Sequence, residues 1–310
     1  MPLHISLGNA IHHDRISAAS GMVAVDGRLF VIGDNSPLLF ELDPQIRVLG
    51  SSVIREYPVG DDGLIPKKTK PDFEAMTCFS WHEKNWLLII GSGSKADVRE
   101  WAFMLSVDDT SLRHERKISE LYNAFYQRGK LSGEQTLNIE GLAVAHEHVY
   151  FLNRGNSAHN MIFRLPLAEL ISYMTGVTDV IDTLEFFAVK LPVLDGFEAG
   201  FSDADFWPET SSLVYSASVE ATGDAYNDGE IRGSYIGLIA LAQLQGDKVL
   251  DLGGSAQLLQ QAGKTLLTKV EAVALTRSDQ HGVCGVLASD NDNGSSDFFT
   301  VSVRNTPAPG

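Results

Sequence analysis

A short pattern recurs five times along this chain of 310 residues and limits the folds open to it. Each copy has a polar residue, a small residue, an apolar segment, a turn and a second apolar segment. The copies begin near Ser20, Glu74, Glu140, Asp203 and Glu271, so the repeat is 54 to 68 residues long. A repeat of this length, built from short strands, predicts a β-propeller in which each unit is one four-stranded blade.

The two ends of the chain complete the last unit. Residues 271–310 supply only three apolar segments, and the N-terminal segment LHISLG supplies a fourth. We therefore predict an all-β, single-domain, five-bladed propeller over residues 1–310, in which residues 1–19 complete the last blade and the N-terminal strand pairs with it; six blades is the alternative. Short helices are expected over residues 119–127 and from Pro166 onward.

Composition excludes some classes of partner. The chain has 40 acidic and 24 basic residues and a net charge of −16, which disfavours nucleic acid because a phosphate backbone requires a positive surface. No apolar stretch is long enough to span a bilayer and no secretory leader is visible, so we expect a cytoplasmic protein without a membrane partner. Two cysteines cannot make a disulfide framework.

Acidic residues stand at matching points of the repeats. Glu74, Glu140, Asp203 and Glu271 each begin the first strand of a unit, and first strands of propeller blades surround the axis. Carboxylates that converge there repel one another unless they are protonated, paired with basic side chains or bridged by a metal. Several hard oxygen ligands suit Ca²⁺, which is the cofactor we expect. Internal pairing with Lys and Arg is the alternative.

A second set of polar residues follows the second strand of four units. It comprises Asp34, Arg154, Glu220 and Asp290. The three acidic members add to the candidate metal ligands. Arg154 is a candidate for binding an anionic group, together with its neighbours Asn153 and Asn156 and with two lysines, Lys70 and Lys269, that precede the acidic positions.

These segments carry a resemblance to a known class of protein. The segments are PDFEAM, LNIEGLAV, LNRGN, SASVE and VEAVAL with SDND. With them the chain resembles the calcium-site β-propellers grouped as phytase-like and gluconolactonase/paraoxonase-like proteins, and most of all an uncharacterised bacterial branch of them. The resemblance implies a propeller and an axial metal near Glu74, Glu140, Glu220 and Glu271. Those families generally have six blades, whereas this chain has five units.

Two functions are consistent with the sequence. The first is a metal-dependent hydrolase of a phosphoester or lactone, in which Glu140 or Glu271 takes a proton and Arg154 stabilises developing negative charge. The second is a non-catalytic propeller that binds a small ligand or a protein partner. It is suggested by the long loop Gly223–Gly233 and by the lack of a strong catalytic motif in the sequence.

Overall fold

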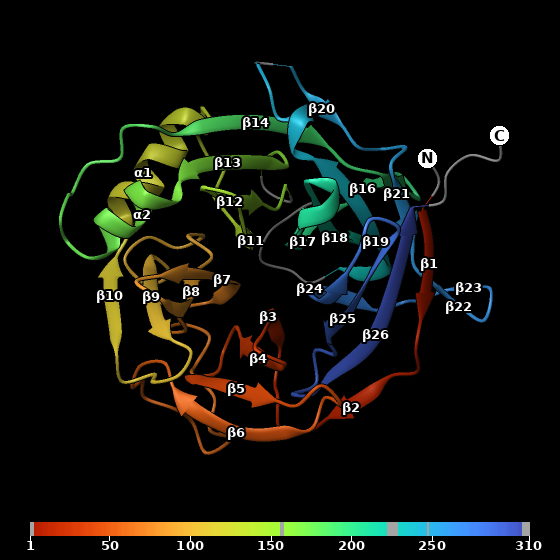
Figure 1. The fold of residues 1–310 in the computed structure, drawn as a ribbon, viewed down its shortest axis with the longest axis horizontal. Coiled ribbons are helices and arrows are strands. Elements are labelled where there is room, and N and C mark those ends of the chain that lie inside the picture. Colours follow the sequence, from red (N-terminus) through yellow and green to blue (C-terminus); the bar gives the residue numbers. More distant parts are fainter. Residues whose placement is uncertain (1–2, 156–157, 222–228, 247, 306–310) are drawn as a thin grey trace.

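Five antiparallel sheets surround a common axis in the computed structural model, which describes residues 3–155, 158–221, 229–246 and 248–305 (Figure 1). The innermost strands of neighbouring blades contact one another all the way around the axis. This arrangement confirms the predicted five-bladed propeller and excludes the six-bladed alternative.

The strands of each blade run from the axis outward in nearly regular order. Blade 1 consists of β3 (Ala19–Val25), β4 (Arg28–Gly33), β5 (Leu38–Leu42) and β6 (Val48–Val53). Blade 2 consists of β7 (Phe73–Trp81), β8 (Lys84–Gly91), β9 (Trp101–Ser106) and β10 (Arg113–Lys117). Blade 3 consists of β11 (Ile139–Ala145), β12 (His148–Asn153), β13 (Met161–Pro166) and β14 (Glu185–Lys190). Blade 4 consists of β17 (Gly200–Trp207), β18 (Ser212–Ala221), β19 (Glu230–Ala240) and β21 (Ala256–Leu258).

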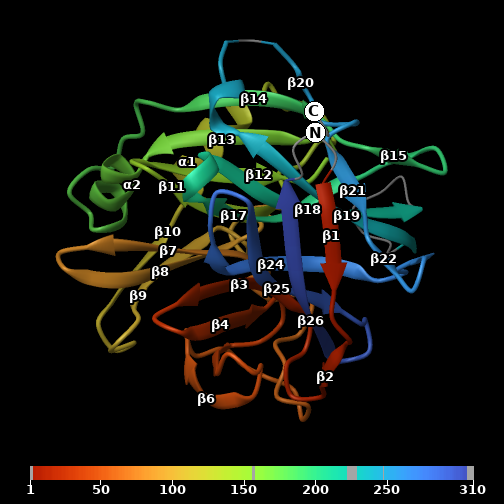
Figure 2. The same cartoon turned by 45° about the vertical axis from the view of Figure 1, so that its right-hand side comes forward.

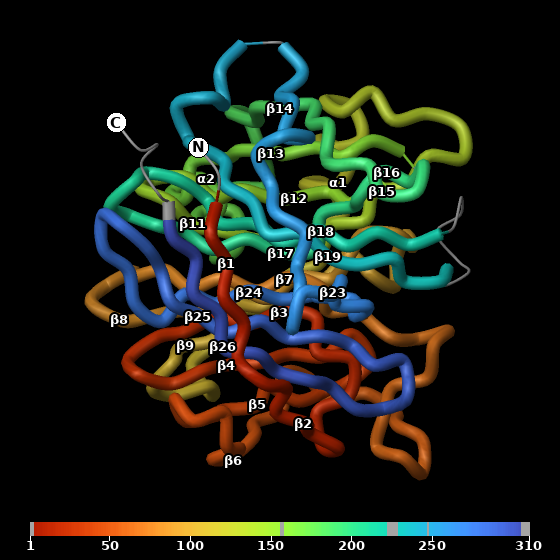
Figure 3. Tube along the Cα trace, turned by 90° about the vertical axis from the view of Figure 1, so that its right-hand side faces the viewer, coloured from red at the N-terminus to blue at the C-terminus, as the bar shows by residue number. Residues whose placement is uncertain are grey.

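Blade 5 joins the two ends of the chain. It consists of β24 (Lys269–Ser278), β25 (Gly282–Asp290), β26 (Ser296–Asn305) and the N-terminal strand β1 (Leu3–Leu7). β1 pairs antiparallel with β26, and β2 (Ile11–His13) pairs with the same strand further along. The N-terminal strand β1 and the last strand β26 therefore lie side by side, as Figure 3 shows. The predicted closure by the N-terminal strand is confirmed, and it covers an edge of β26 that would otherwise be exposed.

The core lies between the blades. Each of five apolar clusters joins the facing sides of two neighbouring sheets. In the cluster between blades 5 and 1, for example, Met22 and Phe40 pack with Ala288 and Phe298. Because both faces of a blade are covered, its middle strands are continuous apolar runs, as in residues 86–90, and do not alternate with polar residues.

Short elements connect the blades. The two expected helices are α1 (Ser119–Arg128), in which the Phe125 ring stacks on Phe163 at 4.4 Å, and α2 (Leu167–Met174). No helix in the described ranges is long and apolar enough to cross a bilayer. The remaining short elements are η1 (Pro208–Thr210), η2 (Leu241–Gln243), β15 (Val193–Leu194), β16 (Phe197–Glu198), β20 (Leu250–Asp251), β22 (Gln260–Gln261) and β23 (Lys264–Thr265). The β15–β16 hairpin projects on the same side as the ends of β18 and β19 (Figure 2).

A bulge near the start of every inner strand positions the site. Near the start of each inner strand the pairing with the second strand skips one residue, and these residues are Ser20, Glu74, Glu140, Ser202 and Glu271. A bulge re-aims the extra side chain. The residue after it must be small where strands approach closely: a Cβ on Gly141 would lie 2.8 Å from the Asp203 Cα. Five equivalent side chains are thus placed at one end of the axis.

Candidate axial cation site

Two further positions in each blade lie close to the bulged residue. One lies two residues before it, and these residues are Ala18, Asp72, Asn138, Gly200 and Lys269. The other lies opposite on the second strand or just beyond its end, and these residues are Asp34, Ser92, Arg154, Ser218 and Asp290. Backbone hydrogen bonds fix the two positions together: the Arg154 N–H, for example, donates to the Asn138 carbonyl at 2.8 Å. The polar residues among these positions meet at one end of the axis.

Blades 3, 4 and 5 contribute a group organised by Arg154. The Arg154 side chain is 4% exposed, and its guanidinium lies 3.0 Å from Glu140 and 3.5 Å from both Glu220 and Glu271. Lys269 is 3.1 Å from Glu220 and 2.7 Å from Glu271. Gly200 provides the space, since a Cβ there would lie 2.5 Å from the Arg154 Cγ. Arg154 and Lys269 thus form ion pairs with the three carboxylates of this group.

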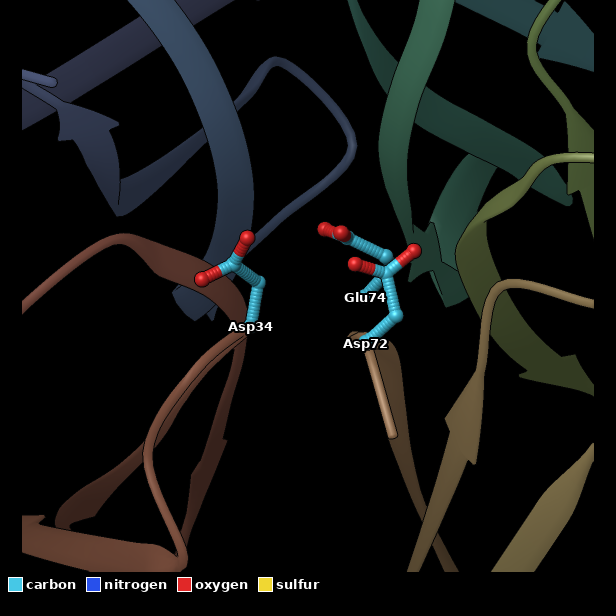
Figure 4. A group of neighbouring side chains, drawn as sticks. All are labelled: Asp34, Asp72 and Glu74. Atoms are coloured by element: carbon cyan, nitrogen blue, oxygen red, sulfur yellow. The ribbon is translucent and has the colours of Figure 1, made fainter. Parts of the chain in front are cut away.

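Blades 1 and 2 contribute a second group. Carboxylate oxygens of Asp34, Asp72 and Glu74 all lie within 4.8 Å of one another, and Figure 4 shows Asp34 facing the other two across the gap between the blades. Lys70 contacts Asp34 and lies 2.8 Å from Asp72, which also accepts a hydrogen bond of 2.5 Å from Arg99. Lys70 and Arg99 thus form ion pairs with two of the three carboxylates, and Glu74 has no such partner among the described residues.

Together with Asp290 these two groups form what we call the axial cluster. Its carboxylates are Asp34, Asp72, Glu74, Glu140, Glu220, Glu271 and Asp290, and its basic groups are Lys70, Arg99, Arg154 and Lys269. Seven acidic groups therefore face four basic ones. Within the part of the chain that the structure describes, Glu74 and Asp290 form no ion pair with Lys or Arg. If every group were charged, the cluster would be short of positive charge.

The pKa values reflect this shortage. Burial raises the pKa of Glu140 to about 7 even though Arg154 opposes the shift, and burial likewise raises the pKa of Asp290 to about 7. Burial and the neighbouring Asp72 raise the pKa of Glu74 well above its usual range. For Glu220 burial acts in the same direction, but Arg154 and Lys269 outweigh it and hold the pKa below its usual range. In Glu74, Glu140 and Asp290 burial therefore outweighs the nearby favourable interactions, and these carboxylates retain protons more readily than carboxylates in water.

Three of the sequence-predicted positions need correction. The bulge of blade 4 is Ser202, so Asp203 lies one residue further on; its carboxylate is fully buried and accepts a 3.0 Å hydrogen bond from the Val273 N–H. Asp203 therefore lies outside the axial cluster. A one-residue shift in a strand turns the side chain to the other face.

The second correction concerns Glu220. Ser218 occupies the position that the sequence assigned to Glu220. Glu220 nevertheless reaches the cluster, because it lies two residues further along the same strand and so on the same face.

The third correction concerns Asn153. Its side chain is fully buried, accepts a hydrogen bond from the Asn138 N–H and donates to the carbonyls of Arg154 and His159, so its amide is used within the fold. Asn156 lies outside the described residues. The other predicted residues are brought together: Asp34, Lys70, Glu74, Glu140, Arg154, Lys269, Glu271 and Asp290.

Sequence reasoning missed three members of the site. Asp72 and Asn138 precede their bulge glutamates by two residues, and Asn138 donates a 2.6 Å hydrogen bond to Glu140. The spacing of Lys269 before Glu271 was a usable signal for both, because residues i and i+2 of a strand share a face. Arg99 lies in a loop and offered no such signal.

The family model that matches this chain covers residues 15–303, which is nearly the whole propeller, and describes DUF6929, a family of unknown function. The chain belongs to this family. No curated protein sequence matches this DUF6929 chain. The resemblance to phytase-like and gluconolactonase/paraoxonase-like proteins stays a prediction.

Solved structures align with nearly the whole chain. Glutaminyl cyclase from Myxococcus xanthus has a TM-score of 0.50 and 11% identity, covering 98% of this chain and 97% of that one. Arabinanase Arb43A from Bacillus subtilis has a TM-score of 0.49 and 11% identity, covering 95% and 96%. At 11% identity the similarity to the glutaminyl cyclase is one of fold alone.

Proposed function

We propose that the axial cluster binds Ca²⁺ and that the protein hydrolyses a phosphoester or a lactone there. The observation that carries the proposal is the charge imbalance of the cluster, seven carboxylates against four basic groups. Buried carboxylates without partners either bind protons or bind a cation. A divalent cation would compensate most of the imbalance at neutral pH.

Asp34, Asp72 and Glu74 are the residues that would hold the ion. They offer carboxylate oxygens from two blades within 4.8 Å of one another. One oxygen of Asp34, Oδ1, is buried and accepts no hydrogen bond from the described residues, which fits an atom reserved for a ligand. A set of hard oxygen donors suits Ca²⁺, since this ion accepts about six to eight oxygens in loose geometry. When bound, the ion would polarise a substrate oxygen.

The neighbouring side chains would accept the proton from water and stabilise negative charge on the substrate. Glu140 has a pKa raised to about 7, so near neutral pH it can accept a proton from water that attacks the phosphorus or the carbonyl carbon. Asn138 and Arg154 hold its two oxygens at 2.6 and 3.0 Å. The Arg154 guanidinium, 3.0 Å from Glu140, is the group that would stabilise negative charge as it develops on the substrate. Glu271 is the alternative base.

The experiment is a hydrolysis assay against a panel of phosphoesters and lactones, with calcium and with chelator. We expect turnover that chelator removes. Glu140→Gln should lower kcat about 10²- to 10⁴-fold, the usual contribution of a general base. Glu83→Gln, in the exposed turn between β7 and β8, is the matched control and should leave kcat unchanged. Absence of chelator-sensitive hydrolysis in both substrate classes would refute the proposal.

The position of Lys70 favours the second candidate function, a non-catalytic propeller that binds a small ligand or a protein partner and needs no ion. Lys70 contacts both Asp34 and Asp72, so its ammonium supplies positive charge where an ion would lie. In this case wild type would bind no calcium, and Lys70→Met would gain calcium affinity by freeing two carboxylates. Calorimetric titration of wild type and of Lys70→Met with calcium distinguishes a calcium site, as the first function requires, from carboxylates paired with Lys70. Much of the Gly223–Gly233 loop lies outside the described residues, so a protein partner stays a prediction, as does the cytoplasmic location.

A further inference from the structure

A pocket of about 190 Å³ opens beside the axial cluster, between blades 3 and 4. Its walls include Arg154, Asn160, Phe197, Gly200, Ser218 and Glu220. Pockets for drug-sized ligands are typically about 300–1,000 Å³, so this one has room for a single small ring. Arg154 and Glu220 belong both to this pocket and to the axial cluster, so the pocket is placed to bind an adjoining part of the substrate.

The buried polar atoms of the pocket favour a ligand that both donates and accepts hydrogen bonds. Arg154 Nη2 is buried and makes no hydrogen bond with the described residues. Glu220 Oε1 lies 3.5 Å from it and 3.1 Å from Lys269, and a carboxylate oxygen has a second lone pair that can accept from another donor. An unmade hydrogen bond of a buried group costs about 1–3 kcal/mol, so a ligand that supplies it gains affinity. A hydroxyl group satisfies both atoms, because it donates to the carboxylate and accepts from the guanidinium.

The charge of the pocket favours a neutral ligand. The positive charge of Arg154 is already shared among Glu140, Glu220 and Glu271. Glu220 has a pKa below its usual range and so is ionised at neutral pH, and Glu198 adds a second carboxylate to the lining. A phosphate or carboxylate group in this pocket would therefore face two carboxylates beside a single guanidinium whose charge is already shared.

One wall of the pocket is aromatic. Phe197 lies on β16, where it pairs with Leu194 across the short hairpin, and its ring is half-buried. Figures 2 and 3 both place this hairpin beside β18 and β19. The carbon-bound hydrogens of a saturated ring pack well against an aromatic face. An aromatic wall opposite paired polar atoms suits a ring with an apolar face and polar edges.

We infer that this pocket binds a neutral polyhydroxylated ring, namely a monosaccharide unit of the substrate. The inference deepens the proposed function and rests on it for the reacting group: the phosphoester or lactone bond would lie at the axial cluster, and the sugar ring beside it in the pocket. Hydroxyl groups bond to Arg154 and Glu220, and the face of the ring packs on Phe197.

The test measures binding of simple probes by calorimetry and saturation-transfer NMR. The probes are glucose, xylose, glucono-1,5-lactone and inorganic phosphate. We expect at least one neutral probe to bind, and Phe197→Ala and Glu220→Gln each to weaken that binding tenfold or more. Val193→Ala, on the same hairpin but 62% exposed and outside the pocket, should bind like wild type. The inference is overturned if no neutral probe binds, if phosphate binding is weakened by Phe197→Ala as strongly as binding of the neutral probe, or if Phe197→Ala binds the neutral probe like wild type.

A calcium titration of the same samples separates this inference from the proposed function. Phe197→Ala should keep the calcium affinity of wild type, because Phe197 is not among the carboxylate ligands. Calcium binding without binding of any neutral probe overturns the pocket assignment and leaves the calcium site standing. Binding of a neutral probe that Phe197→Ala abolishes, in a protein that binds no calcium, supports the pocket and refutes the calcium site.

Discussion

Single side chains decide whether the axial cluster is stable. Arg154 is the most connected of them, since it lies within 3.5 Å of three glutamates while its own side chain is 4% exposed. Breaking a buried ion pair by removing one partner is strongly destabilising, because the remaining charge stays buried without compensation. The stability of the fold and the electrostatics of the site therefore depend on the same residue.

Replacement of this arginine should destabilise the protein. We expect Arg154→Met to lower the free energy of unfolding by about 3–5 kcal/mol at neutral pH, and Arg154→Lys by less, because the lysine retains a charge. Lys117→Met removes an exposed ion pair with Asp97, which solvent screens, and should leave the stability nearly unchanged. Urea unfolding measures all three. Equal effects of Arg154→Met and Lys117→Met would contradict the buried network.

Glu140 should make stability depend on pH. Its folded-state pKa, about 7, is above the usual 4.5, so between these values the folded protein binds the proton more tightly than the unfolded chain does. The free energy of unfolding should therefore fall as pH rises from about 4.5 to about 7. Asp290 acts in the same direction. Urea unfolding at pH 5, 6 and 7 in chelator should show a weaker slope for Glu140→Gln; an unchanged slope would argue against the raised pKa.

At the scale of the element, the N-terminal strand closes the propeller. β1 pairs with β26 over five residues, from Leu3 opposite Asn305 to Leu7 opposite Val301. Its half-buried side chains Leu3, Ile5 and Leu7 pack on the cluster between blades 4 and 5. An unpaired edge strand is a template for association with other chains. A segment of five residues thus protects a sheet whose other strands lie at the opposite end of the sequence.

Deletion of residues 1–8 should expose the edge of β26. We expect a loss of about 3 kcal/mol in the free energy of unfolding, from the buried area of three partly covered aliphatic side chains, together with concentration-dependent association. Light scattering coupled to size exclusion and urea unfolding measure these effects. His4→Ala, at an exposed position of the same strand, should behave like wild type. A monomeric deletion variant of full stability would contradict the closing role of β1.

On the scale of the whole molecule, the ring of blades brings together residues that are far apart in the sequence. Asp34 and Asp290 belong to blades 1 and 5, yet both lie in one cluster with glutamates of the other blades. Each blade supplies one or a few polar groups, and only the closed ring makes a site of them. Binding at the axis therefore links the stability of all five blades.

Calcium should stabilise the whole propeller. A ligand that binds only the folded state at 100 times its Kd adds about 2.7 kcal/mol, which raises Tm by about 4 °C in a protein of this size. Glu74→Gln should reduce this shift, since Glu74 contributes one of the clustered carboxylates and has no basic partner among the described residues. Melting curves in calcium and in chelator provide the measurement, with Glu83→Gln as control. Identical curves for wild type would exclude a calcium site.

Much of the architecture was predictable because it depends on local patterns. The five-fold repeat, the continuous apolar strands and the missing fourth strand of blade 5 are all visible in the chain, and so are α1 and α2. Most of the convergent polar residues were found for the same reason. The register of blade 4 was not: SDADF has a serine and an aspartate side by side, and only strand pairing shows that Ser202 is the bulged residue.

The order of apolar and polar residues along the chain was enough to establish five blades and their closure by the N-terminus, because strand periodicity and repeat length are local properties. Which carboxylates find a basic partner could be learned only from the folded ring. Arg154 contacts glutamates of three blades, and Glu74 and Asp290 are left without such a partner among the described residues. Distances across an axis depend on how the sheets pack, and electrostatic pairing at 3 to 4 Å follows from those distances.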